Sequence, residues 1–213
     1  MTQIVWIARH ANRLDFVNPE WFNTAERPYD PPLSEDGFMQ AKELGKRLQL
    51  EKIQHIFASP FLRTVQTANE VAYSLDLPIK LEAGLSEWLN PDWMPKMPDR
   101  LSPEALAKKY PRIDLRYESR VIPEYPESEE DVLARTGRTV QQLVLEFAED
   151  ILLIGHGASV LGSTRGLVGG NTGYRVALCS LFKVVKASEQ WVLELEGDIS
   201  HLSQSEQKVR FNL

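Results

Sequence analysis

The sequence has a single cysteine and no long apolar run. These two absences argue against a disulfide-stabilised protein and against a membrane-spanning protein. Cys179 cannot form a disulfide within the chain, and its apolar neighbours are typical of a core position. No stretch approaches the roughly 18 apolar residues that a membrane span requires. The first residues also lack the basic and apolar regions of a signal peptide. We therefore expect a cytoplasmic protein that does not contact a membrane.

An excess of positive charge is also missing. Lysine and arginine together number 24 against 30 aspartates and glutamates, which gives a formal net charge of −6. This balance argues against a nucleic acid as partner and makes any local basic pocket conspicuous. The length of 213 residues and the 43% hydrophobic content fit one globular domain over residues 1–213.

The motifs of several common catalytic classes are absent. The sequence contains no C-x-x-C, H-E-x-x-H or H-x-H pattern, so we expect no metal and no cofactor. It also has no G-x-S-x-G motif for a serine hydrolase. The glycines at 166, 169 and 170 lack the lysine of a phosphate-binding loop.

Strand-like and helix-like hydrophobic periods alternate along the chain, which predicts an α/β fold with a three-layer αβα sandwich and a mostly parallel central sheet. Serines at 34, 59 and 128 are predicted to cap helices, with Pro60 at a first helical position. The expected strands span residues 3–9, 53–58, 78–82 and 151–154, with a hairpin at 176–185 and 190–196. Helices are expected over 34–50, after Ser59-Pro60, over 128–148 and after Gly157.

The segment from Asn90 to Glu127 has a different composition. More than half of the prolines in the chain lie there, together with Trp93 and several charged residues. We interpret residues 90–127 as an insertion over the sheet edge with one short helix near 102–109. Long irregular segments of this kind usually act as lids or binding loops.

A histidine with arginines nearby on both sides follows the first expected strand. In open α/β sheets, chemistry gathers just beyond the carboxyl ends of strands, and His10 lies at such an end between Arg9 and Arg13. Guanidinium groups are shaped to grip phosphate oxygens. The cluster indicates a site that holds a phosphate and attacks it. The alternative for His10 alone is a histidine that merely ends a strand.

A second histidine ends another apolar strand. His156 follows residues 151–155 and precedes Gly157, where a helix opens. The imidazoles of His10 and His156 would lie at the same edge of the sheet and share a pocket. The N-terminus of the helix after His156 would add backbone N–H donors for an anion. The alternative is an imidazole that only binds a backbone carbonyl.

Two further charged residues are candidates for the same edge. Arg63 lies in the first turn of its expected helix, where a cation opposes the helix dipole, and such departures from local rules favour a function. Glu87 lies between Leu85 and Trp88, which would desolvate it and raise its pKa into the range of a general acid. A solvated arginine and an ordinary surface glutamate are the alternatives.

Five motifs together resemble those of the histidine phosphatase superfamily, which has the phosphoglycerate-mutase-like fold. The R-H-A-x-R start, the Glu-Trp pair and the insertion most resemble the suppressor-of-T-cell-receptor-signalling group. Ala11 stands where most members have glycine. The motifs are Arg9-His10-Ala11, Leu33-Ser34-x-x-Gly37-x-x-Gln40-Ala41, Ser59-Pro60-x-x-Arg63-x-x-Gln66-Thr67-Ala68, Gly84-Leu85-Ser86-Glu87 and Gly155-His156-Gly157.

The resemblance implies a metal-independent phosphomonoester hydrolase. His10 would attack phosphorus and form a phosphohistidine, and Glu87 would protonate the leaving oxygen. The resemblance implies His10, Glu87, His156 and Arg9 as catalytic residues. The phosphate would be bound by Arg9, Arg13, Arg63 and His156. The substrate would be a phosphorylated small molecule or a phosphopeptide, and the sequence does not fix the oligomeric state.

Two other functions remain open at the level of the sequence. One is a phosphoglycerate mutase or sugar-bisphosphatase of the same fold, although the mutase sequence E-R-x-Y-G is absent and Arg13 stands where mutases do not usually have an arginine. The other is a module that binds phosphate without turnover. The complete set of two histidines, three arginines and a glutamate favours an enzyme.

Overall fold

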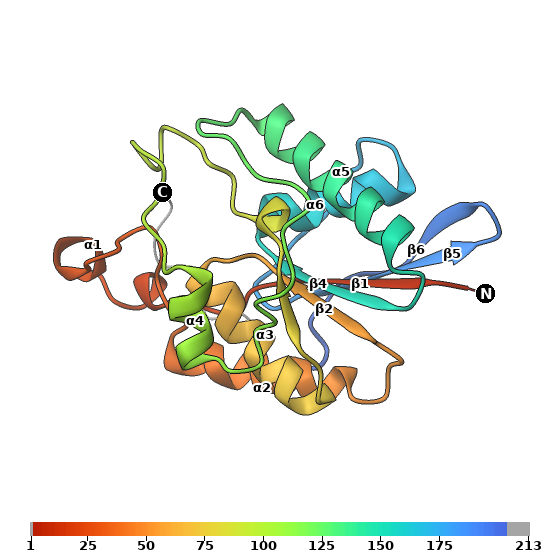
Figure 1. Ribbon diagram of the computed structural model, residues 1–213, viewed down its shortest axis with the longest axis horizontal. Helices are drawn as coiled ribbons and strands as arrows, with labels where there is room; N and C mark the ends of the chain where they lie inside the picture. Colours follow the sequence, from red (N-terminus) through yellow and green to blue (C-terminus); the bar gives the residue numbers. More distant parts are fainter. Residues whose placement is uncertain (1, 204–213) are drawn as a thin grey trace.

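The computed structural model describes residues 2–203, and its six strands form one mixed sheet (Figure 1). The spatial order is β3-β2-β4-β1-β5-β6. The first four strands in that order run parallel, whereas β5 pairs with β1 antiparallel and β6 closes the hairpin. The strands are β1 (Ile4–Arg9), β2 (His55–Ala58), β3 (Ile79–Leu81), β4 (Ile151–Gly155), β5 (Leu181–Ala187) and β6 (Gln190–Asp198).

Helices cover both faces of this sheet (Figure 1). One face carries α2 (Glu35–Leu48), α3 (Leu62–Leu75) and α4 (Pro103–Lys109), and the other carries α5 (Glu129–Glu146) and α6 (Gly157–Val168). A separate cluster of buried apolar side chains fills each interface between sheet and helices. The predicted three-layer sandwich with a mostly parallel sheet is therefore confirmed. Short elements complete the chain: η1 (Leu14–Phe16), α1 (Trp21–Thr24) and η2 (Ala83–Leu85).

The structure confirms two of the three predicted serine caps. The hydroxyl of Ser34 accepts from the Gly37 amide at the start of α2, and Ser128 forms a capping box with Asp131 at the start of α5. The third prediction is wrong. Helix α3 begins at Leu62, its N-cap residue is Phe61 and no side chain caps it, so Ser59 is not the cap and Pro60 is not in the first helical position. The hydroxyl of Ser59 instead bonds to His156.

The carboxyl ends of β1, β2 and β4 lie side by side, and this arrangement places the candidate residues. β4 lies between β1 and β2, with Arg9 opposite Gly155 and Ala58 opposite Ile154. The next residues along these strands are His10, Ser59 and His156. The prediction that both strand-end histidines lie at one sheet edge is confirmed.

The segment 90–127 contains α4 close to its predicted position and otherwise irregular backbone. It adds a parallel bridge between Ile113 and Ile79 at the β3 edge of the sheet. This bridge lies at the sheet edge, and the division of the chain into one domain with an insertion at 90–127 stays a prediction. Within residues 2–203, we find no helix with the length and apolar character needed to cross a membrane.

Candidate active site

The two strand-end histidines lie beside each other beneath the surface. The rings of His10 and His156 have centroids 5.3 Å apart and are both fully buried. The amide of His10 donates to the Gly155 carbonyl at 2.9 Å, which ties the end of β1 to the end of β4. The aromatic ring of Phe61 packs edge-on against His156, with centroids 5.1 Å apart.

The hydrogen bonding of His10 selects one tautomer. Its Nδ1 lies 2.8 Å from the carbonyl oxygen of Ala11. Because a carbonyl oxygen only accepts, Nδ1 carries the proton and Nε2 keeps its lone pair. This Nε2 is buried and has no hydrogen-bond partner among the described residues. Burial and then the charge of Arg63 hold the pKa of His10 well below its usual value, so the ring is neutral at pH 7.

The loop after His10 is held by residues of the helix motifs. The amide of Ala11 donates to Thr67 on α3, and the amide of Asn12 donates to Gln40 on α2. A Cβ at Gly37 would lie 2.1 Å from the Asn12 carbonyl oxygen, so only glycine allows α2 to approach this loop. The motif residues outside the site therefore fix the backbone that presents His10.

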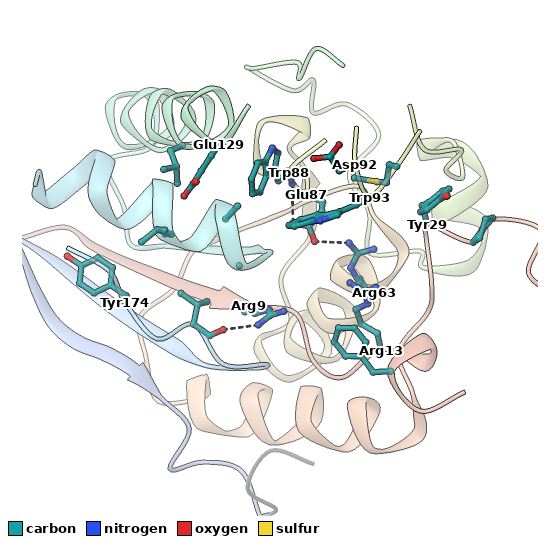
Figure 2. Close-up of a pocket in the computed structure, with 18 of the residues that line it drawn as sticks. Arg9, Arg13, Tyr29, Arg63, Glu87, Trp88, Asp92, Trp93, Glu129 and Tyr174 are labelled. Atoms are coloured by element: carbon teal, nitrogen blue, oxygen red, sulfur yellow. Dashed lines mark hydrogen bonds and ion pairs between the residues drawn. The ribbon is translucent and has the colours of Figure 1, made fainter. Parts of the chain in front are cut away.

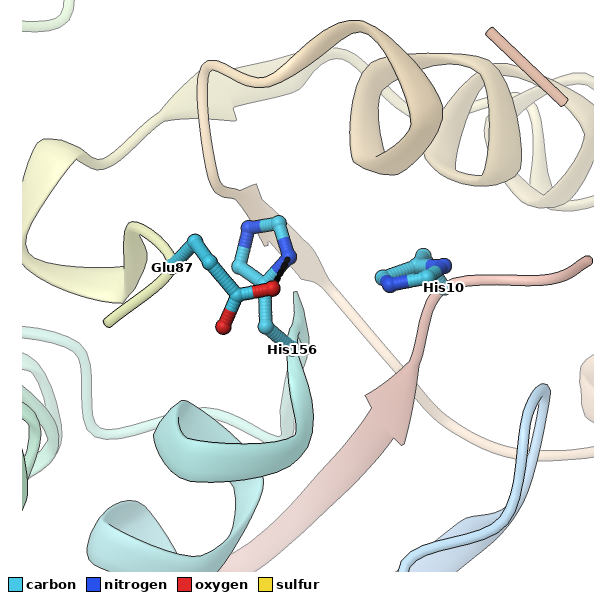
Figure 3. Close-up of side chains that lie close together, drawn as sticks. All are labelled: His10, Glu87 and His156. Carbon is cyan, nitrogen blue, oxygen red and sulfur yellow. Dashed lines mark ion pairs between the residues drawn. The ribbon is translucent and has the colours of Figure 1, made fainter. Parts of the chain in front are cut away.

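Glu87 connects two of the candidate groups, Arg63 (Figure 2) and His156 (Figure 3). Its Oε2 lies 3.3 Å from Nδ1 of His156 and 3.2 Å from Nη2 of Arg63. On its other side, His156 is bound through Nε2 by the Ser59 hydroxyl at 2.8 Å. Burial, opposed in part by the charge of Glu87, lowers the pKa of His156 to about 4.

The expected raised pKa of Glu87 is not found. Burial alone would raise its pKa, as predicted from Leu85 and Trp88, but the charges of His156 and Arg63 outweigh burial. They hold the pKa of Glu87 well below its usual range. The sequence showed the apolar neighbours of Glu87 and did not show that the fold brings Arg63 and His156 to its carboxylate.

Arg63 is a buried cation with unused donors. Its side chain is 2% exposed, and its Nε and Nη1 have no hydrogen-bond partner among the described residues. Burial lowers its pKa to about 10, so it stays charged at neutral pH. The alternative of a solvated surface arginine is wrong. A buried guanidinium with free N–H groups beside two histidines is arranged to receive an anion.

The other two predicted arginines lie at the same site. Arg9 donates from Nη1 to the Val176 carbonyl at 2.8 Å. Arg13 stacks over Phe16 and donates from Nε to Asp15 at 2.9 Å, with a second bond from Nη2 to the same carboxylate. Asp15 is buried and orients Arg13, and sequence reasoning did not single it out.

A cavity of about 800 Å³ opens over these residues (Figure 2). Arg9, Arg13, Arg63 and Glu87 belong to its charged lining, together with Asp92 and Glu129. The buried histidines do not line it. Most of the remaining wall is aromatic or apolar, and it includes Phe16, Phe22, Tyr29, Trp88, Trp93, Met94, Leu133, Leu161, Tyr174 and Val176.

The same site also contains a possible cation-binding group. Potential ligand atoms of His10, Glu87 and His156 all lie within 4.8 Å of one another. The spacing of these residues in the sequence gave no sign of this cluster. We expected no group of side chains able to bind a metal, and the three side chains are nevertheless close enough to do so. Three guanidiniums border the cluster and repel a cation there, which makes its donor set a poor fit for a resident metal.

The chain matches a family model described as the histidine phosphatase superfamily, branch 1, over residues 5–199. It belongs to this family. The predicted resemblance is therefore confirmed, and it covers nearly the whole sequence.

The chain is similar to proteins whose names describe different functions. The Saccharomyces cerevisiae transcription factor tau 55 kDa subunit is 28% identical over 95% of this chain and 57% of its own length. The Drosophila melanogaster ecdysteroid-phosphate phosphatase is 27% identical over 89% of this chain and 31% of its own length. The chain thus spans between about a third and three fifths of these two relatives.

Two further similarities bear on the resemblance. Human ubiquitin-associated and SH3 domain-containing protein A is 32% identical over 66% of this chain and 23% of its own length, which confirms the similarity to the suppressor-of-T-cell-receptor-signalling group. The structure of the Bombyx mori ecdysone phosphate phosphatase with tungstate superposes with a TM-score of 0.80 at 22% identity. That match covers 97% of this chain and 95% of the other, and it confirms the phosphoglycerate-mutase-like fold.

Proposed function

We propose that this protein hydrolyses phosphate monoesters through a phosphohistidine on His10. The observation that carries the proposal is the buried Nε2 of His10, which has no hydrogen-bond partner among the described residues, in a ring that lies within the electrostatic influence of Arg63, Arg9 and Arg13. Nδ1 is occupied by the Ala11 carbonyl, so the lone pair on Nε2 is the nucleophile. Family membership and the complete set of candidate residues support the same function.

The arginines supply the charge that the reaction needs. In phosphoryl transfer, negative charge spreads over the equatorial oxygens, and fixed cations stabilise it. Arg9, Arg13 and Arg63 border the cavity, and His156 lies behind Glu87. These groups would bind the phosphate without a metal ion. Metal independence remains a prediction.

Substrate binding would change the protonation of Glu87. A phosphate that takes the free N–H groups of Arg63 competes with the bond between Arg63 and Glu87. Its negative charge also favours the protonated forms of Glu87 and His156. Both effects raise the pKa of Glu87 from its low value. The acid is therefore made by substrate binding.

The chemistry then runs in two steps. The bond between Nε2 of His10 and phosphorus forms as the bond to the leaving oxygen breaks, and the proton of Glu87 moves to that oxygen. A water then attacks phosphorus, the bond to His10 breaks, and Glu87 takes the proton of the water. Glu87 and His10 end as they began, and the products are an alcohol or phenol and phosphate.

The residues of the cavity wall favour a phosphate monoester whose only anionic group is the phosphate as the substrate. Arg9, Arg13 and Arg63 are the cations that line it, and all three are used by the phosphate, while Asp92 and Glu129 add negative charge. The carboxylate of a phosphoglycerate or a second phosphate would find no partner there. This favours a phosphatase over a mutase or sugar-bisphosphatase. An apolar leaving group fits the aromatic wall, in line with the relative named as an ecdysteroid-phosphate phosphatase.

The insertion contributes to this wall and would shape the pocket for substrates. Asp92, Trp93 and Met94 come from residues 90–127. In this proposal the segment acts as a binding loop, and the substrate is a phosphorylated small molecule or a phosphopeptide. The proposal also places the protein in the cytoplasm. The lone buried cysteine supports this location.

A direct test is to trap the intermediate. The protein is mixed with an aryl phosphate labelled in its phosphorus and quenched in alkali, which preserves phosphohistidine. We expect label on the peptide that contains His10, release of phosphate, and faster turnover of aryl phosphates than of phosphoglycerates or sugar phosphates. Binding of phosphate without any turnover would instead indicate a non-catalytic module.

A further inference from the structure

A buried arginine from α5 holds the backbone around Glu87. Arg135 is 2% exposed, and its Nη1 donates to the Gly84 carbonyl at 2.7 Å. Its Nη2 donates to the carbonyl of Glu87 itself at 3.2 Å. Both nitrogens also reach the Ser86 carbonyl, at 3.2 and 3.3 Å. One guanidinium therefore satisfies three carbonyls within four residues of the chain.

A buried glutamate completes this arrangement from the other side. The carboxylate of Glu127 accepts from Nε of Arg135 at 2.5 Å and from its Nη2 at 2.8 Å. The same carboxylate accepts from the Leu89 amide at 3.2 Å, and the Glu127 carbonyl accepts from the Trp88 indole at 2.9 Å. Residues 84–89 are thus held on both sides of Glu87. We call this pair the Arg135–Glu127 clamp.

Close packing adds to the hold on this segment. A Cβ at Gly84 would lie 2.2 Å from Oγ1 of Thr139, one turn beyond Arg135 on α5. The segment therefore approaches the helix as closely as a glycine permits. The part of Glu87 that reaches the phosphate site is its side chain, so the clamp acts on the backbone and leaves the carboxylate free to exchange partners.

We propose that Arg135 and Glu127 are positioning residues that aim the Glu87 carboxyl at the leaving oxygen. The inference rests on the proposed function, in which Glu87 donates that proton. Proton transfer requires a heavy-atom distance of about 2.6–3.2 Å, and a displacement of about 1 Å is costly. A planar, five-donor guanidinium can bind three carbonyls and a carboxylate at once, and an ammonium cannot.

The test is a double-mutant cycle between Arg135→Lys and Glu87→Gln. The substrates are 4-nitrophenyl phosphate, whose leaving group departs readily, and phenyl phosphate, whose oxygen needs a proton. We expect Arg135→Lys to lower kcat/KM by about 10-fold or more for phenyl phosphate and by less than about threefold for the nitrophenyl ester. In the Glu87→Gln background it should change kcat/KM by less than about twofold for either substrate.

Arg120→Lys is the matched control. Arg120 donates from Nε to Glu146 of the same helix, α5, at 2.7 Å, and the hydrogen bonds of its guanidinium within the described residues go to Glu146 and to the Glu118 carbonyl. We expect this variant to keep the wild-type ratio of the two kcat/KM values. A fall in that ratio as large as in Arg135→Lys would show a general effect of α5 and overturn the proposal.

Folding is followed in the same samples by thermal melting and by binding of inorganic phosphate. If Arg135→Lys does not fold, Glu127→Gln takes its place, because it keeps the shape of the side chain and weakens the hold on Arg135. Equal losses on both substrates, or full additivity with Glu87→Gln, overturn the clamp as a positioning device. So does loss of phosphate binding in both clamp variants. A lack of substrate dependence in Glu87→Gln alone would instead reject the acid role in the proposed function.

Discussion

Oε2 of Glu87 lies 3.3 Å from Nδ1 of His156, and the same oxygen lies 3.2 Å from Nη2 of Arg63. One carboxylate oxygen thus faces two groups that a phosphate would also bind. The interaction with these two groups holds the pKa of Glu87 well below its usual range, against the opposing effect of burial. In the proposed mechanism a bound phosphate takes over this partner role, so that binding and formation of the catalytic acid would be coupled.

Replacement of His10 should abolish turnover with the fold intact. Loss of a covalent nucleophile costs several orders of magnitude in kcat. We therefore expect His10→Ala to retain less than about a thousandth of the wild-type kcat and to bind inorganic phosphate. His55→Ala, which changes a strand histidine paired with Glu149 away from the site, should keep its activity. A His10→Ala variant with more than about a tenth of the activity would place the nucleophile elsewhere.

Arg63 should contribute most to anion binding among the three arginines, because it is buried and two of its nitrogens have no hydrogen-bond partner in the part of the chain that the structure describes. We expect Arg63→Gln to weaken binding of inorganic phosphate or vanadate by about 100-fold, measured by calorimetry or inhibition. Arg100→Gln is the control, since Arg100 packs over Phe61 and does not line the cavity. Equal affinities of wild type and Arg63→Gln would remove Arg63 from the anion site.

The sequence predicted the arrangement of the site where local signals agree with the fold. His10 and His156 end apolar strands, and parallel strands bring such ends to one sheet edge. The short helix of the insertion and the caps at Ser34 and Ser128 follow from residue type alone. These features depend on neighbours close along the chain.

Features that depend on distant neighbours were missed. Ser59 has the sequence signature of a cap, but α3 begins three residues later and its hydroxyl binds His156 instead. One of the first backbone amides of α3 finds its acceptor in Asp30, whose carboxylate accepts from the Leu62 amide at 2.7 Å. The low pKa of Glu87 likewise needs Arg63 from another element. Sequence spacing carries no information about such encounters.

Activity should survive removal of divalent cations. The cluster of His10, Glu87 and His156 is close enough to hold an ion, but the guanidiniums beside it disfavour one. We expect kcat and KM for an aryl phosphate to be unchanged after dialysis against EDTA. Loss of activity that a divalent ion restores would contradict this and assign the cluster to a metal.

The acid role of Glu87 should be visible in the leaving-group dependence. An activated aryl phosphate departs without a proton, whereas an alkyl phosphate needs its oxygen protonated. We expect Glu87→Gln to lower kcat/KM for alkyl phosphates by roughly 100-fold or more, with a much smaller loss for 4-nitrophenyl phosphate. Comparison in kcat/KM is needed because Glu87 also acts as a base in the second step. Equal losses would assign the proton to another group, with Asp92 at the same cavity the next candidate.

The buried histidines should also make the stability of the protein depend on pH. The pKa of His156 is lowered to about 4, and that of His10 lies well below its usual value. Below the unfolded pKa of about 6.5, the unfolded state takes up protons that the folded state does not. The free energy of unfolding should therefore fall as pH decreases from about 6.5 towards 4, and protonation of Glu87 in the unfolded state should add to the loss below its usual pKa.

The contribution of His156 can be separated by substitution and by ligand. Within this pH window, each such histidine contributes a slope of up to about 1.4 kcal/mol per pH unit. Urea unfolding of His156→Gln should show a slope smaller by roughly that amount than the wild type. Saturating inorganic phosphate should also flatten the wild-type slope, because the bound anion favours the protonated imidazole. If phosphate stabilises the protein equally at pH 7 and pH 5, with no change in slope, His156 is not electrostatically coupled to the anion site.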